Sequence, residues 1–171
     1  MRILKRKAIA LPTAILLILG IAFGVYSVAR GQGKLNPYVI NLEAGEHTRV
    51  LIATHQTRVK DVIMQEIKQY FKNRPVFISV IDALTLGNVR VEEWDGVVIL
   101  SAIEFGRPPK EVSTFLTKNE GHKNIAVFLT VDSERWNTNL NVDATTSASK
   151  NMKSNGIIEF IDGISKIDGG S

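Results

Sequence analysis

The stretch RVLIATHQTR, residues 49–58, decides how the rest of the chain is interpreted. Its apolar run at residues 50–53 is typical of a buried strand, and the run stops abruptly at the tetrapeptide Thr54-His55-Gln56-Thr57. A helix-like pattern begins at Arg58. A buried strand that ends in a hydroxyl-bearing turn at a helix N-terminus can hold a phosphate, because free backbone N–H groups and the positive end of the helix dipole point at it.

Composition limits the classes of protein to consider. The 171 residues are enough for one domain of ordinary size. The absence of cysteine excludes disulfides, thiolate metal sites and a cysteine nucleophile. Four of the 21 basic residues precede the first apolar run, and the other 17 balance the 17 acidic residues that follow it. This formal neutrality argues against a nucleic-acid partner.

The uncharged residues 8–29 predict a transmembrane helix. At about 1.5 Å per residue they would extend roughly 33 Å, enough to cross the hydrocarbon core of a bilayer. The basic residues before them favour a single-pass protein of the cell membrane, with its N-terminus in the cytoplasm and its domain outside. The alternative is a cleaved signal peptide, for which Ser27-Val28-Ala29 is a possible cleavage site.

We expect four parts in the chain. These are a basic N-terminus with the transmembrane helix at residues 1–30, a tether at 31–47, an α/β domain at 48–162 and a frayed tail at 163–171. Within the tether, Tyr38-Val39-Ile40 could form a short extra strand or lie at the membrane interface.

Hydrophobic periodicity predicts strands that alternate with helices. The expected strands cover residues 50–54, 76–81, 97–102, 124–130 and 157–161. The expected helices cover residues 59–71 and 108–118, residues 144–154 are a polar helix candidate, and residues 82–93 could be a short helix or a loop. Strands that are apolar on both faces predict a doubly wound parallel sheet, for which five strands suit the order 2-1-3-4-5.

In such a sheet, ligands bind beyond the carboxyl ends of the strands, at the point where the strand order reverses. Here that point lies between the first and third strands. The loops that meet there are residues 54–58, 102–109 and 130–136.

The residues at these loops resemble the flavodoxin family, most closely the branch that includes the flavodoxin-like, quinone-linked protoporphyrinogen oxidases. The tetrapeptide Thr54-His55-Gln56-Thr57 matches the family's Thr-Gly-Asn/Gln-Thr phosphate loop, and Arg58 follows it as in the oxidase branch. The likeness continues at residues 94–99 (WDGVVI) and 101–106 (SAIEFG), and it covers roughly residues 48–161.

This resemblance implies a noncovalent FMN site. Its residues would be Thr54, His55, Gln56, Thr57, Arg58, Ser101, Ala102, Ile103, Glu104, Phe105, Gly106, Asp132 and Ser133. The threonine hydroxyls and Gln56 would donate to the phosphate, and Arg58 would neutralise its charge. Phe105 would lie against the flavin ring, and Asp132 and Ser133 would reach its pyrimidine side.

The sequence also departs from the family pattern. His55 replaces the loop glycine, and a left-handed conformation at this residue would cost about 1–2 kcal/mol. Ile52 replaces a hydroxyl residue, and Glu104 is acidic where the oxidase branch tends to be basic. A simpler interpretation makes Thr54 and Thr57 an N-cap and a first-turn hydroxyl, and His55 a solvated loop residue.

Two functions therefore stay open. In the first, the protein is a membrane-anchored FMN carrier or small oxidoreductase that exchanges electrons with a membrane quinone or a redox protein. In the second, the same fold has lost the flavin and binds other proteins at the membrane. Hydrolase motifs, a Walker-type loop and the glycine-rich dinucleotide fingerprint are missing from the sequence.

Overall fold

The computed structural model describes residues 20–21, 34–44, 48–103, 107–131, 144–147 and 154–168. The chain divides into two compact units, Met1–Gln32 and Gly33–Ser171. In the first unit only Gly20 and Ile21 are described, and both are helical, so nearly all of the expected transmembrane segment lies outside the described residues. Within the described ranges, no helix is long and apolar enough to span a bilayer.

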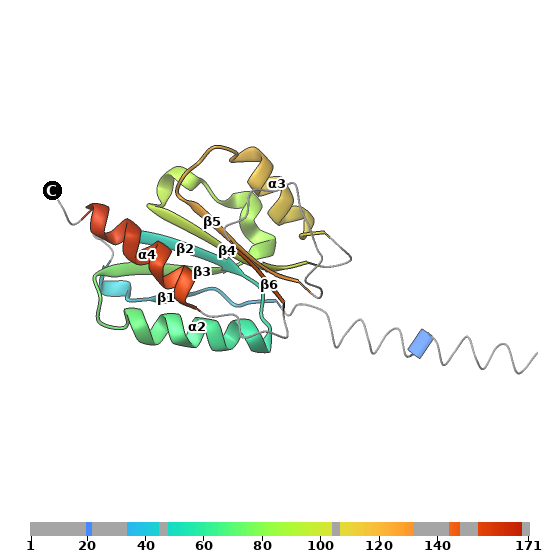
Figure 1. Ribbon diagram of the computed structural model, residues 1–171, viewed down its shortest axis with the longest axis horizontal. Helices are drawn as coiled ribbons and strands as arrows, with labels where there is room; N and C mark the ends of the chain where they lie inside the picture. Colours follow the sequence, from blue (N-terminus) through green and yellow to red (C-terminus); the bar gives the residue numbers. More distant parts are fainter. Residues whose placement is uncertain are drawn as a thin grey trace, which may run out of the picture. The chain divides into compact units, whose positions relative to one another are not determined.

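A six-stranded, mostly parallel sheet forms the centre of the second unit (Figure 1). Its strands are β1 (Tyr38–Ile40), β2 (Thr48–Thr54), β3 (Val76–Asp82), β4 (Gly96–Ala102), β5 (Ile125–Val131) and β6 (Ala144–Ser147). They lie in the order β1-β3-β2-β4-β5-β6, with β1 antiparallel to β3 and every other pair parallel. The five parallel strands therefore have the order 2-1-3-4-5, and the mixed α/β class is confirmed.

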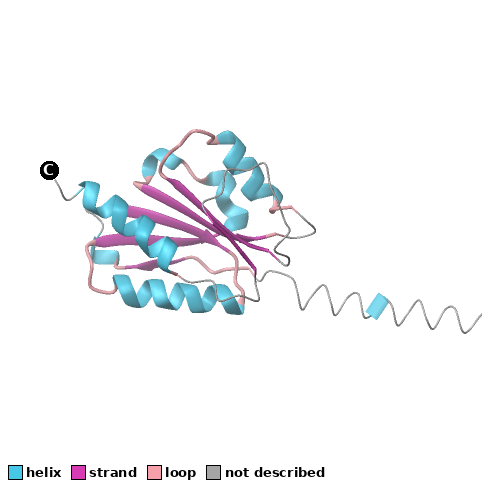
Figure 2. Ribbon diagram, in the orientation of Figure 1, coloured by secondary structure: helices cyan, strands magenta, loops and turns pink. Residues whose placement is uncertain are grey.

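Helices cover both faces of this sheet (Figure 2). The helices α2 (Arg58–Phe71) and α4 (Asn155–Asp168) lie on one face. The helix α3 (Lys110–Lys118) and the 3-10 turns η2 (Ala83–Asn88) and η3 (Val91–Glu93) lie on the other, and a third such turn, η1 (Leu42–Ala44), follows β1.

The two faces explain the continuous apolar runs of the central strands. In β2, Val50 and Ile52 pack with α2 and α4, whereas Leu51 and Ala53 pack with α3 and η2. Successive residues of a strand point to opposite faces, so a strand covered on both sides must be apolar throughout.

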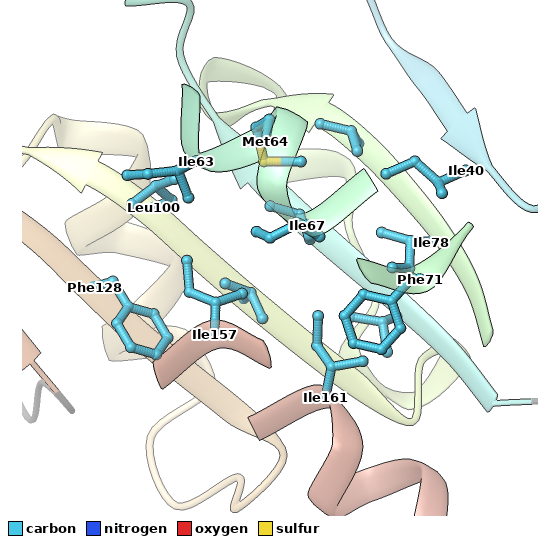
Figure 3. Packing of buried hydrophobic residues seen from close by; sticks show 14 of the residues in the cluster. Ile40, Ile63, Met64, Ile67, Phe71, Ile78, Leu100, Phe128, Ile157 and Ile161 are labelled. Carbon is cyan, nitrogen blue, oxygen red and sulfur yellow. The ribbon is translucent and has the colours of Figure 1, made fainter. Parts of the chain in front are cut away.

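The core beneath α2 and α4 is built from large aliphatic and aromatic side chains (Figure 3). Ile67 and Phe71 of α2 are fully buried, as are Ile157 and Ile161 of α4. Burying each such side chain contributes about 1.5–3 kcal/mol. This cluster fixes α2, and therefore the turn before it, to the sheet.

The C-terminal region differs from the expectation. Residues 157–161 were expected as the fifth strand, but they belong to α4, and the fifth parallel strand is β6. Ile157 and Ile161 are buried at a helical spacing of four, with exposed Glu159 between them. The helix candidate at residues 144–154 is wrong at residues 144–147, which pair with β5. The helix α4 also runs to Asp168, into the segment expected as a frayed tail.

The possible extra strand at Tyr38-Val39-Ile40 is confirmed as β1. Directly after it, Asn41 has a φ of 56°, which favours Asn or Gly. Its side-chain Nδ2 donates to the carbonyl oxygens of Phe71, Arg74 (3.1 Å) and Val76 (3.2 Å). Asn41 therefore ties the edge of the sheet to the end of α2.

The helix α4 packs closely on the start of β4. A Cβ at Gly96 would lie 2.3 Å from Ile164 Cδ1 and 3.4 Å from the Phe160 ring. Beside this contact, Asp162 accepts a 2.6 Å hydrogen bond from the Tyr70 hydroxyl and lies 3.4 Å from Arg74. These contacts join α4 to both the sheet and α2.

We predict that Gly96→Val destabilises the fold by about 1–3 kcal/mol, because the new side chain overpacks the contact with α4. Urea unfolding measures the loss, and adding Ile164→Ala should recover part of it. Nothing lies within 4 Å of a Cβ at Gly87, so Gly87→Val should cost no more than about 0.5 kcal/mol. Equal losses at the two glycines would contradict this packing.

Candidate functional site

The turn after β2 is short. The strand β2 ends at Thr54 and α2 begins at Arg58, so three residues join them. Thr57 is the N-cap, because its Oγ1 accepts a hydrogen bond of 3.3 Å from the backbone N–H of Lys60. The simpler interpretation made Thr54 the N-cap and Thr57 a first-turn hydroxyl, and it is wrong about which threonine caps the helix. The hydroxyl proton of Thr57 remains available to a ligand.

The expectation of backbone strain at His55 is wrong. Among the described residues, Asn41 is the one non-glycine residue with a positive φ. His55 therefore makes the turn without the left-handed conformation that a glycine would supply, and the expected cost is not incurred.

The imidazole of His55 is buried rather than solvated, so the solvated-loop interpretation is also wrong. His55 is 3% exposed, and its Nδ1 lies 3.5 Å from Oδ1 of Asp82, at the end of the neighbouring strand β3. Thr54 is equally buried, and its hydroxyl donates to the His55 carbonyl at 3.4 Å. The first half of the turn thus faces the interior.

Asp82 holds three segments together. Its Oδ2 accepts from the backbone N–H of Leu35 at 2.6 Å, and its Oδ1 accepts from that of Leu84 at 2.9 Å. With His55 beside Oδ1, this carboxylate binds the chain before β1, the start of η2 and the turn after β2. Asp82 itself is 2% exposed, so these contacts replace its lost hydration.

The second half of the turn reaches solvent. Gln56 and Arg58 are exposed and Thr57 is half-buried. These three residues lead into the first turn of α2, whose free backbone N–H groups favour an anion.

The loops after β4 and β5 begin at the same edge of the sheet as this turn. Thr54 pairs with Leu100, and Ala102 with Thr130, so the carboxyl ends of β2, β4 and β5 are adjacent. Half-buried Ala102 lies at this edge, and buried Ile103 donates its N–H to the Thr130 carbonyl at 2.8 Å. The expected residues Glu104, Phe105, Gly106, Asp132 and Ser133 lie outside the described residues.

Among the expected site residues that the structure describes, Ser101 has a buried hydroxyl that lacks a hydrogen-bond partner. It is fully buried near the end of β4, and its Oγ has no hydrogen-bond partner among the described residues. A buried hydroxyl normally has a hydrogen-bond partner. The Ser101 Oγ therefore indicates that a further polar group binds at this edge of the sheet.

A pocket of about 480 Å³ lies between the turn, α2 and the segment before β1. It is lined by Leu35, Asn36, Tyr38, Thr54, His55, Gln56, Lys60, Asp61, Met64, Gln65 and Lys68. Burial and the charge of Asp61 raise the pKa of the Tyr38 phenol, so Tyr38 keeps its proton at neutral pH.

The sequence analysis missed the buried lysine of this pocket. Lys60 is 2% exposed and lies on the helix face that carries Met64, Ile67 and Phe71. The spacing of four, three and four residues is the pattern of a buried stripe, so periodicity could have identified Lys60.

No cluster of metal-ligating side chains occurs in the described part of the chain. Comparisons with protein-family models and with curated proteins give no match for this sequence.

We predict that Asp82→Ala destabilises the protein by about 2–4 kcal/mol, since it leaves the buried N–H of Leu35 and the part-buried N–H of Leu84 without their acceptor. Asp95 is the matched control, because it accepts from the Arg49 N–H at 2.7 Å but is exposed. Asp95→Ala should cost about 1 kcal/mol or less in the same urea unfolding experiment. Similar losses for both variants would show that Asp82 does not organise the turn.

Proposed function

We propose that the protein is a membrane-anchored, flavodoxin-like protein that binds FMN noncovalently. It would transfer electrons, or carry out a small oxidoreductase reaction, with a membrane quinone or a redox protein as partner. One observation carries this proposal: a capped three-residue turn leads from the central strand β2 into a 14-residue helix, at the sheet edge where β4 and β5 also end. This is the place where open α/β sheets bind ligands.

The residues present fit a phosphate group. Gln56, Thr57 and Arg58 are the members of the turn that reach solvent, and they offer an amide, a hydroxyl and a guanidinium. Thr54 and His55 would support the turn from inside rather than touch the phosphate, which narrows the contacts implied by the resemblance. Ser101, on the adjacent strand end, offers a hydroxyl to the same edge.

FMN, when bound, supplies the electron-transfer chemistry, and the chain holds and orients it. The exposed Arg58 would compensate the negative charge of the phosphate. The membrane anchor would restrict diffusion, so that encounters with a membrane partner become frequent.

A second candidate function is a flavin-free module that binds proteins at the membrane. The contact between His55 and Asp82 favours it, because that pair buries the residue where the family has its loop glycine. The two functions differ in whether FMN binds.

We predict that the full-length protein in detergent quenches FMN fluorescence saturably. The dissociation constant should be below about 10 μM, which corresponds to a binding free energy of roughly −7 kcal/mol. Arg58→Ala should weaken binding about tenfold or more, because it removes a charge-assisted hydrogen bond. Lys72→Ala is the control, because Lys72 is exposed at the opposite end of α2. Absence of quenching at far higher protein concentration would favour the flavin-free module.

We also predict that the full-length protein stays in the membrane fraction during alkaline carbonate extraction. Removing residues 1–32, the first compact unit, should release the protein into the soluble fraction. Protease added to sealed, right-side-out vesicles should digest the domain, as the basic N-terminus implies. Extraction of the full-length protein by carbonate would refute the anchor, and protection from protease would refute the orientation.

A further inference from the structure

The strands β1 and β3 are covered on one face of the sheet and partly open on the other. Burial alternates along β3: Ile78 and Val80 are fully buried on the face that α2 covers, whereas Phe77 and Ser79 are half-buried on the opposite face. On the neighbouring β1, Val39 pairs with Ser79 and is 41% exposed. This outer part of the sheet therefore presents apolar side chains to solvent.

An exposed arginine extends this surface to the amino end of β2. Arg49 pairs in register with Phe77, and its Cζ lies 5.7 Å from the centre of the Phe77 ring and 5.1 Å from that of Trp94. The two rings are stacked, with their centroids 6.4 Å apart. A guanidinium within about 6 Å of aromatic rings is attracted to them, so these contacts hold Arg49 in place. We call Val39, Arg49, Phe77, Ser79 and Trp94 the flank surface.

The flank surface has the composition of a protein interface. Aromatic residues and arginine are enriched at the centres of such interfaces, where a few of them carry most of the binding energy. Pairing of a further strand with β1 is disfavoured, because β1 has three residues and lies between Pro37 and Asn41, whose φ is 56°. A partner would therefore dock through side chains.

The charges around Trp94 have both signs. Arg49 and Glu92 are exposed, and neither forms an ion pair with another described residue. Asp95, also exposed, accepts a hydrogen bond of 2.7 Å from the backbone N–H of Arg49. The guanidinium and the Glu92 carboxylate are thus both available to a partner.

This arrangement favours a second copy of the chain over other partners. A strongly acidic partner would be attracted by Arg49 but repelled by Glu92 and Asp95, and a strongly basic partner would meet the reverse. In a dimer with two-fold symmetry, a contact between Arg49 of one copy and Glu92 of the other occurs twice. The flank surface is therefore complementary in charge to itself.

We propose that the flank surface is the interface of a symmetric dimer. Phe77 and Trp94 of each copy pack against the flank surface of the other, and Arg49 of each copy pairs with Glu92 of the other. Arg49 lies five residues before Thr54 in β2, or about 16 Å along the strand. The carboxyl edge of the sheet stays open in this dimer, so the inference goes beyond the proposed function and does not depend on it.

Energy transfer between labelled copies of the full-length protein tests the dimer. The chain has no cysteine, so Gln69→Cys on exposed α2, across the sheet from the flank surface, supplies a single labelling site. Donor- and acceptor-labelled proteins are mixed in detergent with micelles in excess. We expect transfer to rise saturably with protein concentration, with half-saturation on the order of 10 μM, as for a small non-obligate interface.

Exchange of the two charges identifies the contact. Arg49→Glu and Glu92→Arg should each raise the half-saturation concentration at least about tenfold, because each places like charges together at both contacts. A mixture of donor-labelled Arg49→Glu and acceptor-labelled Glu92→Arg has opposite charges at both contacts again. Half-saturation should then return to within about threefold of the original value. The control Lys72→Glu, exposed at the end of α2, should leave it unchanged.

A second pair of variants tests the apolar part of the surface. Val39 is 41% exposed and Val62, on α2, is 55% exposed, so both positions tolerate a carboxylate in the monomer. Val39→Glu should raise the half-saturation concentration at least about tenfold, because it buries a charge in the interface. Val62→Glu should not change it.

Three results would overturn the proposal: no saturable transfer, transfer that neither charge reversal nor Val39→Glu weakens, or no recovery in a mixture of charge variants that are each folded by urea unfolding. The second would place the contact between copies elsewhere in the chain. A further result would assign the flank surface to an acidic partner instead. In that case transfer is absent, and a peptide rich in glutamate and leucine changes tryptophan emission saturably unless Arg49→Glu is present.

Discussion

The candidate site depends on the contacts of one buried group, the carboxylate of Asp82. It joins the ends of β2 and β3 to the chain that precedes β1, through two backbone N–H groups and the imidazole of His55. A buried charge is stable only when hydrogen bonds replace its hydration, so these three segments must come together for the carboxylate to be accommodated. Once they do, the direction of the turn into α2 is set.

Because of these contacts, the three-residue turn has one buried side and one exposed side. His55 points to the interior and forms part of the pocket beside α2, whereas Thr57, with Arg58 after it, lies at the exposed start of the helix. The free N–H groups at this exposed start of the helix favour negative charge. The proposed flavin site is a consequence of this local geometry.

Much of the fold could be predicted from the sequence. The central strands are apolar throughout, which a sheet covered on both faces explains, and the threonines before Arg58 indicate a helix N-terminus. The last strand could not be predicted, because residues 157–161 are a short apolar run that fits a strand or a buried helix equally well. The true edge strand, Ala144–Ser147, is polar and carries no hydrophobic signal.

The site was harder to predict for a different reason. The pairing of His55 with Asp82 joins residues that are far apart in the chain, and it requires both the strand order and the position of Leu35. The family pattern assigned His55 to the phosphate, whereas burial assigns it to the interior. The burial of Lys60 could have been predicted, because helical periodicity alone places it on the buried face of α2.

The most direct test of the central claim is the ³¹P resonance of FMN during a pH titration with the full-length protein. If the turn at Thr57 and Arg58 holds the phosphate, the resonance will move from its free position and stay that of a dianion well below the usual second pKa of about 6. A ³¹P resonance that keeps the position and the titration curve of free FMN would contradict the account.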